Sequence, residues 1–147
     1  MRYPLAAALT ALTLPAAAHA QMQPGQWEVT SNVVSADIPG APPRAAEAMR
    51  KPHVMRSCVT PEQAARGPLA VTKESSNCRI TRRAMGGGKM SAEMVCHQPG
   101  GGTMTATTSG SFTPVSFAMT TRMVMTGAQA MSVTSTATGK RVGACGK

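Results

Sequence analysis

Four cysteines, Cys58, Cys78, Cys96 and Cys145, constrain this chain more than any other feature. Cys78 and Cys96 lie near the two ends of the stretch NCRITRRAMGGGKMSAEMVCH (77–97), at equal distances from a run of three glycines. Such a glycine run favours a tight turn between two antiparallel strands. The stretch is therefore a candidate for a metal site, a reactive thiol pair or a disulfide-linked hairpin.

A hairpin with the glycines 86–88 as its turn places Cys78 directly opposite Cys96. One face would carry Cys78, Ile80, Arg82 and Ala84 against Cys96, Met94, Ala92 and Met90; the other would carry Arg79, Thr81 and Arg83 against Val95, Glu93 and Ser91. The first face is largely apolar and the second largely polar, as a half-buried sheet requires. A three-residue loop can carry a bulge that shifts this pairing by one residue. Of the three connectivities of four cysteines, we predict Cys78–Cys96 and, by elimination, Cys58–Cys145.

Metal or redox chemistry at these cysteines has less support. Zinc sites usually use close cysteine pairs such as C-x-x-C, and the sequence has none. Cys96 and His97 are adjacent, but successive strand residues point to opposite faces of a sheet. Structural disulfides are therefore the favoured interpretation.

The first 20 residues have the three parts of a signal peptide. Arg2 supplies a basic start, Leu5 to Leu14 an apolar segment too short to span a bilayer, and residues 18–20 (AHA) a small-x-small cleavage site. We expect cleavage near Ala20/Gln21 and a periplasmic or secreted mature protein, an environment in which disulfides persist. No later stretch approaches the ~20 apolar residues of a transmembrane helix, so we expect no membrane span.

The remaining residues, 21–147, have the length of a single domain. Trp27, Phe112 and Phe117 are its only aromatic residues, and a small core of this kind favours disulfide staples. Apolar and polar residues alternate in QWEVTSNVV (26–34), and Thr, Ser, Val and Met dominate the sequence after Pro99. We predict an all-β fold: a curved antiparallel meander of about six to eight strands that forms an open barrel or half-barrel.

One short helix is expected within this sheet protein. The segment TPEQAARG (60–67) has Thr60 as N-cap, Pro61 at the first helical position and Gly67 beyond the end. The Pro- and Ala-rich segment 36–52 is predicted to be a loop, in which RAAEAMR (44–50) could form two helical turns.

Methionine is unusually frequent, with 12 residues in the chain. Met119, Met123 and Met125 would share one strand face, and thioether clusters can bind Cu(I). These residues, with His97, form an alternative metal site. The favoured interpretation is a core of flexible apolar side chains that needs no metal or other cofactor.

The mature chain is basic. Without Arg2, the 15 Lys and Arg residues become 14 against 6 Asp and Glu residues, which leaves a net charge of +8. The basic residues form two groups: Arg44, Arg50, Lys51 and Arg56, and Arg79, Arg82, Arg83 and Lys89. With so few aromatic residues for stacking on bases, we expect no nucleic-acid partner. A solvated basic face, or contact with an anionic component of the envelope, fits this charge better.

No catalytic constellation is recognisable. Only six carboxylates occur, and no two of them form a recognisable acid/base pair. His53 and His97 are the only histidines after residue 20, and no G-x-S-x-G nucleophile elbow is present. We therefore expect a protein that is not an enzyme.

Five short motifs run in order across nearly the whole mature chain: PGQWEV, SCVTPEQA, NCRI, MVC and GKRVGAC. This ordered set resembles the exported bacterial domain-of-unknown-function 3617 family, whose members are small secreted or periplasmic β-rich proteins. By this resemblance, family positions are occupied by Trp27, Cys58, Cys78, Cys96, Gly139, Arg141, Gly143 and Cys145. The Pro-rich segment APPRAAEAMRKPH and the basic charge depart from the family pattern. The resemblance implies no catalytic residue.

The sequence thus favours a binding or structural module of the bacterial envelope. Its concave face would hold a small apolar or anionic ligand, or would be filled by its own side chains. The copper-binding protein is the alternative. A pocket large enough for a ligand would distinguish the first two.

Overall fold

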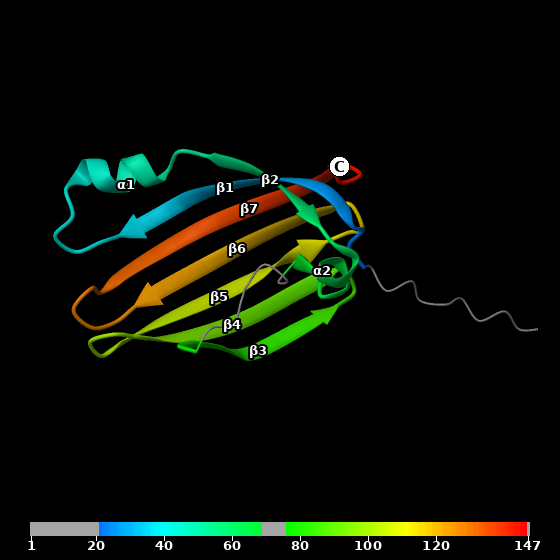
Figure 1. Ribbon diagram of the computed structural model, residues 1–147. Coiled ribbons are helices and arrows are strands. Elements are labelled where there is room, and N and C mark those ends of the chain that lie inside the picture. Colours follow the sequence, from blue (N-terminus) through cyan, green and yellow to red (C-terminus); the bar gives the residue numbers. More distant parts are fainter. Residues whose placement is uncertain (1–20, 69–75, 147) are drawn as a thin grey trace, which may run out of the picture.

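The structure, a computed structural model, describes residues 21–68 and 76–146; the predicted signal peptide lies outside these residues. All strands in the described residues form one antiparallel sheet in the order β2-β1-β7-β6-β5-β4-β3 (Figure 1). The seven strands are β1 (Gly25–Asp37), β2 (His53–Val59), β3 (Cys78–Gly86), β4 (Lys89–Gln98), β5 (Gly102–Phe112), β6 (Ser116–Met125) and β7 (Met131–Gly143). The two helices are α1 (Pro43–Met49) and α2 (Pro61–Ala65). The predicted all-β class, with an open antiparallel sheet, is confirmed.

The sheet consists of a five-strand meander, β3 to β7, and of a hairpin-like pair, β1 and β2, that is added beside β7. Strands β3 to β7 follow one another in sequence and in space, whereas β1 lies between β7 and β2. The two edges of the sheet are therefore β2 and β3. Helix α2 follows β2 directly, and at its end the Arg83 side chain of β3 donates a hydrogen bond to the Arg66 carbonyl over 2.7 Å. This helix thus bridges the two edges at one end of the sheet (Figure 1).

The register sorts the side chains onto two different faces. We call the face that carries Trp27 the inner face, and the opposite one the outer face. The inner face carries Trp27, Val29, Met55, Met90, Met94, Met104, Phe112, Phe117, Met119, Met123, Met125 and Ala137. The outer face carries mainly hydroxyl and charged side chains, among them Thr30, Lys89, Ser91, Glu93, Thr107, Ser109, Thr120, Arg122, Thr136 and Thr138. The period-two alternation predicted for these segments is therefore present.

The hydrophobic core lies at the end of the inner face that α2 covers. Its buried members are Met22, Trp27, Ala64, Met90 and Phe112, of which Ala64 comes from α2. Farther along the inner face, most side chains are only half-buried. A single sheet with one short covering helix therefore encloses only part of its apolar surface.

The segment 36–52 contains more regular structure than expected. Strand β1 continues to Asp37, and α1 occupies Pro43–Met49. The predicted helix is present as α2, and α1 is a second helix where two helical turns were considered possible. Proline at the start of α1 is tolerated because the first N–H groups of a helix have no partner within it, and alanine favours the helix that follows.

The β3–β4 hairpin keeps the predicted cysteine pair but has a different turn. Gly86 pairs with Lys89, so the turn consists of Gly87 and Gly88 alone. Both have positive φ angles, 56° and 71°, which a two-residue turn matching the twist of the strands requires. The predicted three-residue turn was therefore wrong.

A bulge between Ile80 and Arg82 compensates for the shorter turn. Between the bulge and the turn, Ala92 pairs with Arg83 and Met90 pairs with Met85. The predicted partners of Ala92 and Met90 were Arg82 and Ala84. The contact between Thr81 and Glu93 survives, because the Thr81 hydroxyl donates to the Glu93 carboxylate over 2.7 Å. The bulge therefore moves Arg83 to the inner face.

Candidate functional site

A hollow of about 340 Å³ lies on the inner face beneath α2. It is enclosed by β1, β2, β6, β7 and the segment around α2, and its lining residues are Met22, Trp27, Val29, Met55, Ser57, Cys58, Val59, Gln63, Gly67, Pro68, Phe117, Met119 and Ala137. Among the residues that the structure describes, Ser57 and Gln63 supply its polar side chains. Ligand pockets typically have volumes from about 300 Å³ upward and mostly apolar walls. This hollow has the size and lining of a site for a small apolar molecule.

Two aromatic rings form one wall of the hollow. Trp27 is 1% exposed, and its ring stacks on Phe117 with centroids 5.8 Å apart and an interplanar angle of 24°. The indole N–H donates to the Gln23 carbonyl over 3.1 Å, so the polar atom of the ring has a partner. The wall is therefore well packed and fixed in orientation.

Gly139 explains how the two rings meet. Phe117 of β6 pairs with Gly139 of β7, which in turn pairs with Val29 of β1. A Cβ atom on Gly139 would collide with the Phe117 ring. The absence of a side chain on β7 lets the ring lie across that strand and reach Trp27.

The N-terminus of α2 is stabilised by a capping box. The Thr60 hydroxyl accepts from the Gln63 N–H over 3.3 Å, and the Gln63 side chain accepts from the Thr60 N–H over 2.9 Å. The Thr60 side chain also lowers the pKa of Glu62 by hydrogen bonding to its carboxylate.

The C-terminus of α2 is held against the opposite edge of the sheet. Gly67 follows the helix with φ of 74°, and a side chain there would meet the Met85 thioether of β3. Helix α2 is thus anchored at both ends above the hollow.

The side of the hollow at the C-terminal end of α2 is positively charged. In the described strands, Glu28 and Glu93 lie on the outer face, and Asp37 pairs with Ser132 at the far end of β1. Arg83 lies on the inner face and contacts the end of α2 next to Gly67, which lines the hollow. An anionic group at this side of the hollow would therefore meet favourable electrostatic potential.

Both predicted disulfides are present. Cys78 and Cys96 join β3 to β4 with Cα atoms 4.0 Å apart, and Cys96 is 1% exposed. Cys58 of β2 joins Cys145, just beyond β7, with Cα atoms 5.4 Å apart. Because β1 lies between β2 and β7, this second disulfide crosses β1 and ties its two neighbouring strands together. The four cysteines therefore staple the sheet.

The alternative metal set divides between the two faces. Met119, Met123 and Met125 lie on the inner face. His97 pairs with Thr103 and is exposed, whereas its neighbour Cys96 pairs with Met104 on the inner face. His97 therefore lies on the outer face, away from the three methionines. No group of three or more His, Cys, Asp or Glu residues in the described parts of the chain could hold a metal ion.

In each of the two basic groups, one arginine lies opposite a glutamate of a neighbouring strand. Arg56 of β2 forms an ion pair with Glu28 of β1, with 2.8 Å between Nη2 and Oε2. Arg82 pairs with Glu93 across the β3–β4 hairpin on the outer face. Arg56 and Arg82 are both exposed, and exposed ion pairs of this kind contribute little to stability.

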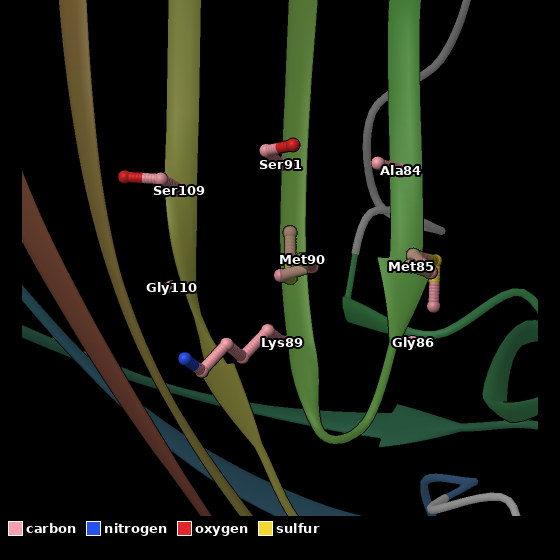
Figure 2. A pocket seen from close by; sticks show the side chains of 8 residues that line it. All are labelled: Ala84, Met85, Gly86, Lys89, Met90, Ser91, Ser109 and Gly110. Carbon is pink, nitrogen blue, oxygen red and sulfur yellow. The ribbon is translucent and has the colours of Figure 1, made fainter.

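A second, wider hollow of about 560 Å³ lies over β3, β4 and β5 (Figure 2). Ala84, Ser91 and Ser109 come from neighbouring strands in one row, and their short side chains leave this space. Lys89 extends beside them toward β5 (Figure 2). The hollow is open to solvent along one side and lacks enclosing walls. The hollow beneath α2 is therefore the stronger candidate for a binding site.

The structure thus defines a class of protein: a curved, disulfide-stapled antiparallel sheet with an apolar hollow under a short helix. The family described as Protein of unknown function (DUF3617) matches residues 22–145, and the chain belongs to this family. No curated protein and no solved structure matches the chain. Neither α1 nor α2, the helices of the described residues, has the length and apolar character needed to cross a membrane.

Sequence reasoning left the binding residues of this hollow unassigned. Met22, Phe117 and Pro68 lie far apart in the sequence and meet only through the strand order and the position of α2. One signal was available: a glycine inside a strand pattern, Gly139, often marks the close approach of another group. That the group packed against Gly139 is the Phe117 ring could not be known without the register of β6 and β7.

Proposed function

We propose that this protein is a non-enzymatic binding protein that holds a small, largely apolar molecule in the hollow beneath α2. The single observation that carries the proposal is the hollow itself, with a volume of about 340 Å³ and a lining whose described residues are apolar except for Ser57 and Gln63. A structural module whose inner face is filled by its own side chains would leave no such space. The volume therefore favours ligand binding over a purely structural role.

The same site supports binding more than catalysis. In the described part of the lining, Ser57 and Gln63 are the polar side chains, and no carboxylate or histidine joins them. A hydroxyl without an adjacent base is a weak nucleophile. The signal-peptide pattern of the first 20 residues supports a binding function in the periplasm or outside the cell, where the ligand would be a component of the envelope.

Trp27 allows a direct test, because it is the only tryptophan and lines the hollow. The mature chain would be titrated with octanoate, decanoate and the corresponding alcohols while tryptophan fluorescence is recorded. Binding predicts a saturable change in emission. If Arg83 also attracts the head group, the carboxylates bind more tightly than the alcohols.

A matched pair of variants locates the binding. Ala137 lines the hollow, whereas Ala118 is exposed on the outer face of the neighbouring strand. Ala137→Phe fills the space and is expected to weaken binding about tenfold or more, which corresponds to about 1.4 kcal/mol. Ala118→Phe is expected to leave binding unchanged. A lack of any saturable change in the unmodified chain, or equal binding by the two variants, would refute the proposal.

A further inference from the structure

Three methionines lie side by side on adjacent strands of the inner face, at the end away from α2. Met104 of β5 pairs with Met125 of β6, and Met125 pairs with Met131 of β7. Directly opposite residues in antiparallel strands have Cβ atoms ~4.5–5.5 Å apart. Each thioether sulfur lies two bonds beyond its Cβ atom, so rotation of the flexible side chains can bring the three sulfurs to one point.

This row is not part of the buried core. Met22 and Met90 are 6% and 3% exposed, whereas Met104, Met125 and Met131 are all half-buried. Met125 also lines a hollow of about 180 Å³ between the turns that follow β4 and β6. An ion could therefore reach these sulfurs from solvent.

The chemistry of the row selects the ion. Cys96 is the next inner-face residue along the row, but its sulfur is bonded to Cys78 and cannot act as a thiolate ligand. His97 lies on the outer face. The ligands are therefore thioethers, which are soft and favour Cu(I) over Zn²⁺, Ca²⁺ or Mg²⁺.

We propose that Met104, Met125 and Met131 form a Cu(I) site with three thioether ligands. This site is separate from the hollow beneath α2, because the Met125 end of β6 is opposite to the Phe117 end. It differs from the set predicted from sequence, since it recruits a methionine from each of three strands, and His97 takes no part. The proposal does not depend on the proposed ligand-binding function.

The test measures Cu(I) binding by the mature chain without oxygen and with ascorbate, in competition with a chromogenic Cu(I) chelator. We expect one Cu(I) per chain and an X-ray absorption spectrum with three sulfur neighbours. Met125→Leu preserves volume and is expected to weaken Cu(I) binding about tenfold or more, about 1.4 kcal/mol.

Met119→Leu is the matched control, because Met119 lies on the same face of β6 but pairs with Gly110 and Ala137. It is expected to bind Cu(I) as the unmodified chain does. The proposal is wrong if the chain fails to compete with the chelator, if nitrogen or oxygen ligands dominate the spectrum, or if the two variants bind equally. Circular dichroism of both variants would show that each is folded.

Discussion

At the scale of single residues, a glycine determines the shape of the candidate site. Gly139 has no positive φ angle, so its role is to provide space and not backbone freedom. The Phe117 ring occupies the position where a Cβ atom would lie, and this lets it stack on Trp27. The strand therefore lacks a side chain at the one position where the aromatic wall of the hollow crosses it.

Gly139→Ala is expected to destabilise the protein by about 1–3 kcal/mol, because the new methyl group displaces the Phe117 ring in a packed region. Urea denaturation followed by circular dichroism would measure this loss. Gly143→Ala, on the same strand with open space around it, is the control and should change stability little. In a Phe117→Leu background the cost of Gly139→Ala should fall. Equal effects of the two alanine substitutions would contradict this explanation.

At the scale of elements, α2 is a very short helix that depends on its caps. Helices of this length are not stable alone, so the capping box, the burial of Ala64 and the contact of Gly67 with Met85 must hold it over the hollow. The Thr60 side chain contributes twice, because it caps the helix and stabilises the Glu62 carboxylate.

Thr60→Ala should therefore destabilise the protein by about 1 kcal/mol. It should also raise the pKa of Glu62 toward its ordinary value, which an NMR titration of the side-chain carboxyl would detect. Since the folded-state pKa is lowered, the carboxylate contributes stability above the unfolded-state pKa, and this contribution is lost as the pH falls through the folded-state value. Thr60→Ser keeps the hydroxyl and should preserve both properties. An unchanged Glu62 pKa in Thr60→Ala would contradict the assignment.

Elements differ in how well the sequence predicted them. Helix α2 was predictable because Thr60, Pro61 and Gly67 are local signals with fixed positions. The disulfide hairpin was predictable because glycines and cysteines agreed on one pairing. The bulge near Thr81 was not, since nothing in the local sequence separates a three-residue turn from a two-residue turn with a compensating bulge.

The candidate site was predictable only in part. Alternation in β1 placed Trp27 and Val29 on one apolar face. The hollow also needs Phe117 and Met119 from β6, and these reach the site because β1 pairs with β7, a strand distant in sequence, as well as with β2. The methionine row has the same origin, since Met104, Met125 and Met131 meet only when three strands have a fixed register.

At the scale of the whole molecule, one sheet face carries two candidate sites at its opposite ends. The covered end holds the apolar hollow, and the uncovered end holds the three methionines. The Cys58–Cys145 disulfide, with a sequence separation of 87, closes the longer of the two disulfide loops and fixes β2 near the hollow. In the chain-entropy model a loop of this size contributes about 4–5 kcal/mol, which is a large share of the stability of a small domain.

The central claim is that the hollow beneath α2 holds a small apolar molecule. Native mass spectrometry of the protein, isolated without denaturation from the cells that produce it, tests it most directly. We expect a discrete mass above that of the polypeptide, which is lost on denaturation and missing from Ala137→Phe but present in Ala118→Phe. A polypeptide mass alone for the unmodified protein, or the same bound mass in Ala137→Phe, would contradict the claim.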